Sequence, residues 1–195
     1  MSFITTLHKN NIPKEWFFFE PFDNNLRKFY DSYPHAGVIF FSKLGHYNNN
    51  FFLKIEPLAK FCTKKKIKFF IPLSSFWALR LKPNGMISFT TMSLANRLNL
   101  KFLKKNYWLA TKVHNRIEAI KSSGFNFVFI SPVFKTQTFP KKKPHNKMYF
   151  FLLCKILKKK IVLALGGVNK TNYKYLKNSN LFGFGGINNF SEYEK

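Results

Sequence analysis

Short apolar runs alternate with amphipathic segments rich in Lys and Asn along nearly the whole chain. The apolar runs predict β-strands at residues 16–19, 37–41, 68–71, 85–88, 107–110, 125–130, 161–165 and 182–187. Strands that alternate with helix-length segments are typical of β-α units around a parallel sheet. Eight candidate strands favour a (β/α)₈ barrel over a doubly wound open sheet, which usually uses fewer strands.

Two of the intervening segments carry clear helical patterns. In "NRIEAIKSSG", Ile117 and Ile120 predict an apolar stripe, and Gly124 predicts a glycine cap. "HNKMYFFLLCKILKKK" predicts a second helix. Helical signals are weak at 72–83 and 90–106, so we expect short or irregular helices after the third and fourth strands. We interpret residues 1–195 as one α/β domain, a compact TIM barrel.

Composition supports a packed core but names no partner. Of the 195 residues, 46% are hydrophobic and 26 are Phe, which excludes an intrinsically disordered chain. Lys and Arg number 33 against 8 Asp and Glu, and the resulting net charge of +25 would attract nucleic acid, anionic lipid or phosphorylated metabolites. Codon bias in an A+T-rich genome explains the same abundance of Lys, Asn, Phe and Ile. The charge therefore leaves the partner open.

Two cysteines, Cys62 and Cys154, have apolar neighbours and a spacing that fits no metal or redox motif, so we expect them in the core of a protein kept in a reducing compartment. The N-terminal stretch lacks an apolar segment of signal-peptide length, and "MYFFLLCKIL" is too short to span a bilayer. These features predict a cytoplasmic protein without a membrane partner.

Glycine pairs end the last two predicted strands. "IVLALGGVN" ends on Gly166 and Gly167, and "LFGFGGINN" ends on Gly185 and Gly186. At the carboxyl end of a barrel, glycine lets backbone N–H groups approach an anion closely. The alternative is that these glycines only make tight turns. The recurrence of the pair on consecutive strands favours a phosphate site.

The stretch "FISPVFKTQTFP" begins as a buried strand and then breaks into a loop. Pro132 ends the ladder pairing, and Thr136 and Thr138 follow in the loop at the same end of the barrel. Their hydroxyls and backbone amides are suited to contact a phosphate.

These segments together resemble one family. "SPVFKTQT", followed by "LALGGVN" and "FGFGGI", is similar to the thiamine phosphate synthase and TenI superfamily, and "ATKVHNRIEAI" is similar to its Gly-x-Ser-x-His segment. The resemblance implies a (β/α)₈ barrel that joins hydroxymethylpyrimidine pyrophosphate to thiazole phosphate and releases pyrophosphate, with Mg²⁺ as cofactor. The TenI branch implies isomerisation of thiazole phosphate instead.

The resemblance also implies site residues. Thr136 and Thr138 fall on the motif threonines near the thiazole phosphate, Gly166 and Gly167 on the glycines after the seventh strand, and the segment of Gly185, Gly186 and Asn188 on backbone amides that complete the site. His114 falls on the histidine taken as an acid/base group in the TenI branch. A helix-start histidine that merely caps or packs is the alternative for His114.

Several positions depart from the family pattern. Phe139 replaces a lysine, for which Lys141 lies close enough to substitute, and Lys112 replaces the serine of Gly-x-Ser-x-His. Of the early basic stretch only Lys43 remains. We therefore take Lys141, His114 and Lys43 as the candidate catalytic residues.

The carboxylates that the family uses for metal are missing. Pro72 and Leu73 stand where an Asn-Asp pair is expected, and no Asp or Glu occurs between Glu56 and Glu118. Mg²⁺ prefers carboxylate oxygens together with substrate phosphates. Glu20 and Asp23 are the remaining candidates near a strand end, and a solvated turn and helix cap is the alternative for both.

The leading interpretation is a thiamine phosphate synthase-like transferase with small phosphorylated pyrimidine and thiazole substrates. A thiazole tautomerase and a non-catalytic phosphate-binding barrel are alternatives. A nucleic-acid-binding module is a fourth, based on lysine triplets at 64–66, 141–143 and 158–160. No base-reading motif supports it, and solvated faces explain the triplets more simply. The sequence does not define an oligomeric state.

Overall fold

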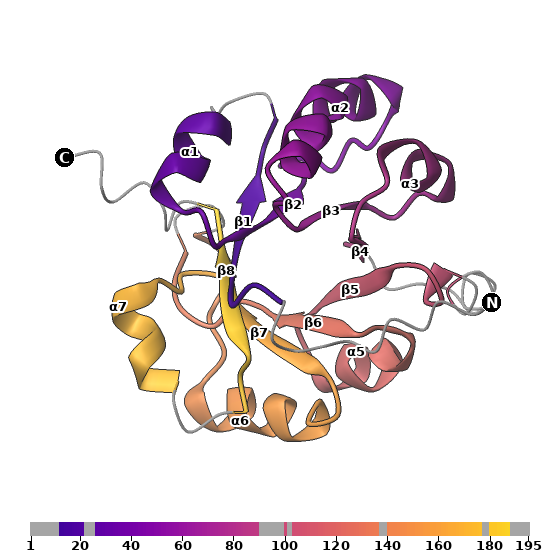
Figure 1. Ribbon diagram of the computed structural model, residues 1–195. Helices are drawn as coiled ribbons and strands as arrows, with labels where there is room; N and C mark the ends of the chain where they lie inside the picture. The colour runs from indigo at the N-terminus through magenta and orange to yellow at the C-terminus, as the bar shows by residue number, and fades with distance from the viewer. Residues whose placement is uncertain are drawn as a thin grey trace.

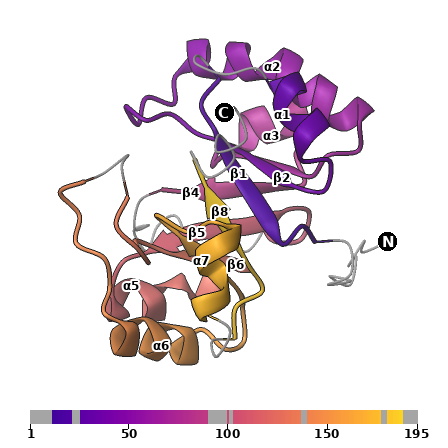
Figure 2. The ribbon, with the colours of Figure 1, turned by 90° about the vertical axis from the view of Figure 1, so that its left-hand side faces the viewer.

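The chain folds into a closed barrel of eight parallel strands in the order β1 to β8, with helices around the outside (Figures 1 and 2). The computed structural model describes residues 12–21, 26–89, 100, 103–136, 140–176 and 180–187. The strands are β1 (Glu15–Phe19), β2 (Gly37–Phe40), β3 (Phe69–Pro72), β4 (Gly85–Ser88), β5 (Trp108–Val113), β6 (Phe127–Ile130), β7 (Ile161–Leu165) and β8 (Gly183–Gly186). All eight predicted strands are confirmed.

Asparagine side chains begin most of the helices. The helices are α1 (Leu26–Ser32), α2 (Asn49–Lys64), α3 (Ser75–Leu81), α5 (Arg116–Lys121), α6 (Lys147–Ile156) and α7 (Lys170–Tyr173). The N-caps of α2, α5, α6 and α7 are Asn48, Asn115, Asn146 and Asn169, and each side chain accepts a backbone N–H of the first turn. The Asn-rich composition thus supplies the signals that start the helices.

The helix after β3 is short, as expected, because α3 has 7 residues. Most of the segment after β4 lies outside the described residues. The prediction for α5 is wrong in its buried face: Ile117 and Ile120 are 64% and 59% exposed, and Ala119 is the buried residue. Gly124 is not a cap either, because α5 passes into a 3₁₀ turn, Ser122–Gly124. A helix this short contacts its neighbours along a narrow strip, so only the docked orientation decides which side is buried.

Aromatic rings fill the inside of the barrel. Trp16 lies 4.5 Å from Phe70 and 6.0 Å from Phe127, measured between ring centroids. A β-carbon at Gly37 would lie 2.5 Å from the Trp16 ring, and one at Gly85 would lie 2.4 Å from the carbonyl oxygen of Trp108 and 2.7 Å from the Phe70 ring. Gly37 therefore makes room for a large ring, and Gly85 makes room for both the neighbouring strand backbone and a ring.

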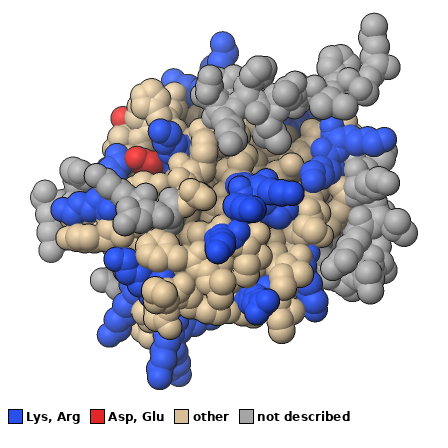
Figure 3. All heavy atoms as spheres, turned by 90° about the horizontal axis from the view of Figure 1, so that it is seen from below, with Lys and Arg blue, Asp and Glu red and all other residues tan. Residues whose placement is uncertain are grey.

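Basic residues are scattered over the surface. Figure 3 shows lysine and arginine scattered over the face seen from below rather than gathered in one stripe, with acidic residues in a small area only. Lys158, Lys159 and Lys160 lie between α6 and β7, on the turn opposite the mouth of the barrel.

Cys62 and Cys154 are buried and free, as expected. Among the described residues, none of the helices is both long and apolar enough to cross a membrane.

Candidate active site

The carboxyl ends of the strands form the mouth of the barrel, which is where sites of this fold are built. Two parts of the mouth differ in chemistry. The β6–β7 side comprises residues 131–136 after β6 and 166–169 after β7. The β2–β4 side comprises residues 42–47 after β2, residues 73–74 after β3 and Phe89 after β4.

The turn after β7 requires glycine at two consecutive positions. Gly166 and Gly167 both have positive φ angles, +88° and +66°. A β-carbon at Gly167 would lie 2.3 Å from the carbonyl oxygen of Lys135, and one at Gly166 would lie 3.0 Å from Pro132. The backbone of this turn therefore packs directly on the loop after β6, with no room for a side chain.

Hydrogen bonds fix the turn through its carbonyl groups. The amides of Val133 and Phe134 donate to the carbonyls of Leu165 and Gly166, at 3.0 Å and 2.9 Å. Asn172 Nδ2 donates to the carbonyl of Gly167 at 2.7 Å.

The amide side of the same turn is open. Among the described residues, no acceptor is found for the backbone N–H groups of Gly166, Gly167 and Val168. Consecutive N–H groups in such a turn form a concavity that binds anions. We call the N–H groups of residues 166–168 the amide cradle.

The structure brings part of the predicted phosphate set together. Thr136 is half-buried and directly follows Lys135, whose carbonyl oxygen packs against Gly167, so Thr136 lies in the loop beside the Gly166–Gly167 turn; a phosphate contact at these residues stays a prediction. Thr138 and Asn188 lie outside the described residues.

The second glycine pair has a packing contact at its first residue. A β-carbon at Gly185 would lie 2.9 Å from the Phe18 ring and 3.2 Å from the Phe129 ring, so this glycine makes room for two core aromatics. Gly186 pairs with Phe17 at the end of β8. A phosphate contact at Gly185 and Gly186 stays a prediction.

A half-buried lysine lies at the mouth between the two sides. Lys112 is on β5, and the residues two and four positions earlier, Ala110 and Trp108, pack inside the barrel, so Lys112 points inward as well. Its Nζ lies 5.0 Å from the centre of the Phe89 ring. Burial, together with the charge of Lys142, lowers the pKa of Lys112 to about 8.

His114 is fixed by Glu118 at the start of α5. Glu118 Oε2 lies 3.1 Å from His114 Nδ1 and accepts the His114 backbone N–H at 2.7 Å, while Oε1 accepts Asn115 Nδ2 at 2.9 Å. Burial lowers the pKa of His114 although Glu118 acts to raise it, and the charges of Lys142 and Lys112 lower it further. The imidazole is therefore mostly neutral at pH 7.

A second histidine, His145, was missed by sequence reasoning. Its Nε2 lies 3.1 Å from the carbonyl oxygen of Ser131, and its ring centre lies 5.4 Å from that of Tyr149. Burial is the main cause that lowers its pKa, and the charge of His114 acts in the same direction. The sequence offered no signal for it beyond its place after the lysine triplet.

The candidate lysines occupy different places. Lys141 and Lys43 are exposed. The lysine of residues 141–143 whose charge reaches both Lys112 and His114 is Lys142. We call Lys112, Lys142, His114 and His145 the basic cluster. Its members come from β5, the start of α5 and the loop after β6. His145 links the cluster to the amide cradle, because its backbone N–H donates to the carbonyl of Pro132, the residue on which Gly166 packs.

The β2–β4 side carries a pair of stacked aromatic rings. Tyr47 stacks on Phe89 with ring centres 5.4 Å apart and planes at 11°. Burial raises the pKa of Tyr47 to about 12. Glu20 is buried and accepts the backbone N–H of Lys43, which ties the ends of β1 and β2 together.

Those residues do not fit a magnesium site built by the protein. Within the described part of the chain, no group of three or more His, Cys, Asp or Glu side chains is placed to hold a metal ion. β3 ends at Pro72 and is followed by Leu73, and β4 ends at Ser88 and is followed by Phe89, so neither strand end supplies a carboxylate. Asp23 lies outside the described residues.

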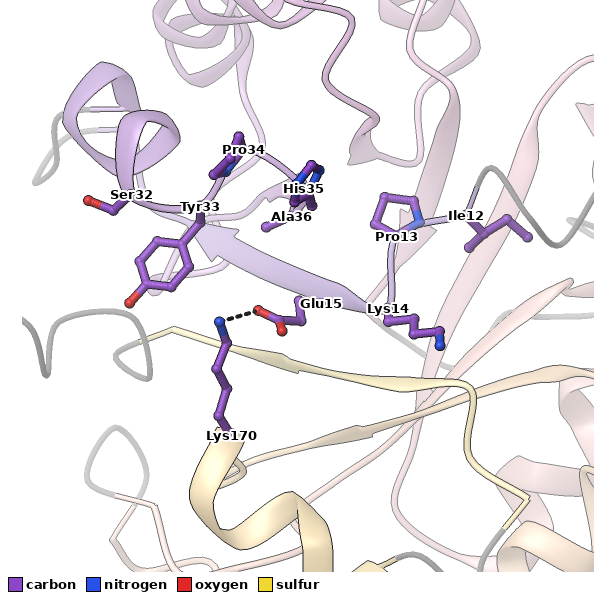
Figure 4. A pocket seen from close by; sticks show the side chains of 10 residues that line it. All are labelled: Ile12, Pro13, Lys14, Glu15, Ser32, Tyr33, Pro34, His35, Ala36 and Lys170. Carbon is purple, nitrogen blue, oxygen red and sulfur yellow. Dashed lines mark ion pairs between the residues drawn. The ribbon is translucent and has the colours of Figure 1, made fainter.

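A separate cavity of about 530 Å³ lies away from the mouth, beside the first residue of β1. Figure 4 shows Lys170 of α7 reaching toward Glu15, with Tyr33 on the opposite wall. Lys170 Nζ lies 3.5 Å from Glu15 Oε2 and 5.2 Å from the centre of the Tyr33 ring. Of the two lysines that line this cavity, Lys170 is thus paired with a carboxylate.

Comparison with known proteins agrees with this arrangement. A model of the family described as thiamine monophosphate synthase matches residues 35–190. The chain belongs to the thiamine monophosphate synthase family. The match includes β2 to β8 and therefore the amide cradle and the basic cluster. A search of curated protein sequences found no significant match.

Solved structures share the fold at low identity. A thiamine phosphate pyrophosphorylase from Pyrococcus furiosus superposes with a TM-score of 0.68 at 15% identity, covering 92% of this chain and 87% of that one. A KDPG aldolase from Legionella pneumophila gives 0.61 at 14% identity, covering 95% and 87%. A putative copper homeostasis protein, CutC, from Streptococcus agalactiae gives 0.62 at 12% identity, covering 90% and 98%. Identities this low show the barrel fold only.

Proposed function

We propose that the chain is a thiamine phosphate synthase-type transferase that joins hydroxymethylpyrimidine pyrophosphate to thiazole phosphate. The observation that supports this proposal is that the amide cradle and the basic cluster lie at the same mouth of the barrel. The amide cradle offers neutral N–H groups that suit a single phosphate, and the basic cluster beside it offers cations that suit a diphosphate. Membership of the family supports the same substrates.

The proposed reaction makes one bond and breaks one. The thiazole nitrogen attacks the methylene carbon of the pyrimidine, and the bond from that carbon to the pyrophosphate oxygen breaks. Negative charge grows on the leaving pyrophosphate, so cations already fixed near it lower the energy of the reaction's transition state. Lys112 and Lys142 supply those cations, while Thr136 and the amide cradle hold the thiazole phosphate in position.

Mg²⁺ is the cofactor that the family implies. Because the described residues do not fit a protein-built site for it, we assign no catalytic step to the metal.

The decisive measurement is pyrophosphate release with both substrates present, over a range of Mg²⁺ concentrations. We expect release by the natural protein and a loss of about tenfold or more in Lys112→Met, because one preorganised charge is removed. Lys159→Met is the matched control, since Lys159 is an exposed lysine at the opposite end of the barrel, and it should keep full activity. Binding of thiazole phosphate without pyrophosphate release at any Mg²⁺ concentration contradicts the proposal.

A thiazole tautomerase is the second candidate, and the His114–Glu118 pair favours it. A mostly neutral imidazole fixed by a carboxylate at the mouth can move a proton on a bound thiazole. Interconversion of thiazole phosphate isomers, followed by NMR, tests this activity. Its abolition in His114→Asn with unchanged phosphate binding supports the tautomerase, and its absence in the natural protein rules the tautomerase out.

A further inference from the structure

Lys112 has surroundings that are unusual for a lysine. Its Nζ lies over the ring of Phe89, and the side chain extends from the inner face of β5 rather than to the outer surface. The charged group that acts on it is Lys142, from the loop after β6. Glu118, the carboxylate of this region, is engaged by His114 and Asn115.

Desolvation and the neighbouring charge of Lys142 make the neutral amine more accessible than in an ordinary lysine, while the ammonium still predominates below pH 8. A lysine that is both desolvated and next to another cation is the arrangement that activates an amine as a nucleophile. With the pKa of Lys112 lowered to about 8, its neutral fraction at pH 7.5 is on the order of a hundred times that of an ordinary lysine.

An anion site lies within reach of this amine. Lys112 is on β5 and the amide cradle follows β7, with β6 between them, so the two strands are about 10 Å apart. A small molecule with a phosphate at one end and a carbonyl at the other can therefore place the phosphate on the cradle and the carbonyl at Nζ.

We propose that Lys112 forms an imine with small phosphorylated aldehydes or ketones bound at the mouth of the barrel. The amine nitrogen bonds to the carbonyl carbon and a proton passes to the carbonyl oxygen, giving a carbinolamine. Loss of water from the carbinolamine gives the imine, so no oxidant or second reactant is needed. This activity shares the amide cradle with the proposed synthase but none of its bond changes.

Pyridoxal 5′-phosphate is a suitable probe because it carries an aldehyde and a phosphate on one small ring. After brief incubation and borohydride reduction, peptide mass spectrometry gives the fraction of each lysine modified. We expect Lys112 to be modified at least tenfold more than Lys160, and inorganic phosphate to suppress modification at Lys112 only.

Lys160 is a matched internal control in the same sample. Burial also lowers its pKa, but it lies at the other end of the barrel, where its Nζ donates to the carbonyls of Ser123 and Phe125 at 3.1 Å and 2.7 Å. Equal modification of Lys112 and Lys160 overturns the proposal, because bulk reactivity would then explain both.

Lys112→Arg supplies the second arm. Arginine keeps the positive charge for anion binding but forms no imine, so the aldimine absorption of the natural protein should disappear while phosphate binding remains. An unchanged aldimine absorption in this variant also overturns the proposal. Modification of Lys112 without pyrophosphate release supports imine formation and contradicts the proposed synthase. Pyrophosphate release without modification of Lys112 supports the synthase and contradicts imine formation.

Discussion

The two sides of the barrel mouth differ in which polar groups they leave open to a ligand. On the β6–β7 side, Gly166 and Gly167 leave backbone N–H groups open, and the basic cluster stands next to them. On the β2–β4 side, Tyr47 stacks on Phe89, and the Glu20 carboxylate accepts the backbone N–H of Lys43. These side chains therefore already have partners within the protein. The comparison teaches that a glycine turn with open backbone N–H groups can be present at one side of a mouth whose other side has apolar packing where carboxylates for metal binding were expected.

The largest effect is expected at Gly167. Gly167→Ala places a methyl group 2.3 Å from a backbone carbonyl and forces alanine to φ +66°, so we expect a loss of about 3 kcal/mol or more in the free energy of unfolding, together with loss of phosphate binding. The measurement is chemical denaturation followed by a phosphate titration.

Gly45→Ala is the matched control, because Gly45 has a similar φ of +73° but nothing within 4 Å of the added carbon. We expect Gly45→Ala to lower the free energy of unfolding by only about 1 kcal/mol, the cost of holding alanine at a positive φ angle. Similar losses in both variants would show that the contact between the turn and the loop after β6 contributes little.

The next effect is expected at Glu20. Glu20→Ala leaves the buried N–H of Lys43 without its acceptor, which should cost about 1–3 kcal/mol of stability, and Glu20→Gln should restore much of it through its amide oxygen. Denaturation curves of the two variants check this. A Mg²⁺ response lost equally in Glu20→Gln and Glu20→Ala would instead make Glu20 a metal ligand.

The basic cluster should distinguish two adjacent lysines. Lys142→Ala should lower turnover by about tenfold, because the charge of Lys142 reaches Lys112 and His114, whereas Lys141→Ala should change it little. The same Lys142→Ala change should raise the pKa of Lys112, measured from the pH dependence of its modification. Equal losses of turnover in the two variants would mean that both lysines act only through the overall charge of the surface.

The smallest effect is a change in titration. Glu118→Gln removes the group that raises the pKa of His114, so the pKa should fall further below its usual value of 6.5, as measured by NMR. Because the folded-state pKa of His114 is depressed, its contribution to stability is present above pH 6.5 and is lost as pH falls. The acid side of the stability profile should therefore steepen in Glu118→Gln, and an unchanged His114 pKa would mean that Glu118 does not act on the imidazole.

The sequence by itself determined the barrel and the position of the glycine turn. Alternation of apolar runs with capped polar segments is local, and the strand of residues 161–165 was predicted with the bounds of β7. The pair Gly166 and Gly167 was readable because only glycine combines positive φ with close backbone approach.

Tertiary structure alone decided which side chains meet at the mouth. Lys112 stood out in the sequence only as a departure from a motif, and its burial on Phe89 beside Lys142 depends on strands and loops that are distant along the chain. The exposure of Ile117 was likewise undetermined, because a short helix presents several apolar positions and only docking selects the buried one. Periodicity reports the preferences of neighbouring residues, whereas pKa values and contacts arise from groups that only the closed barrel brings together.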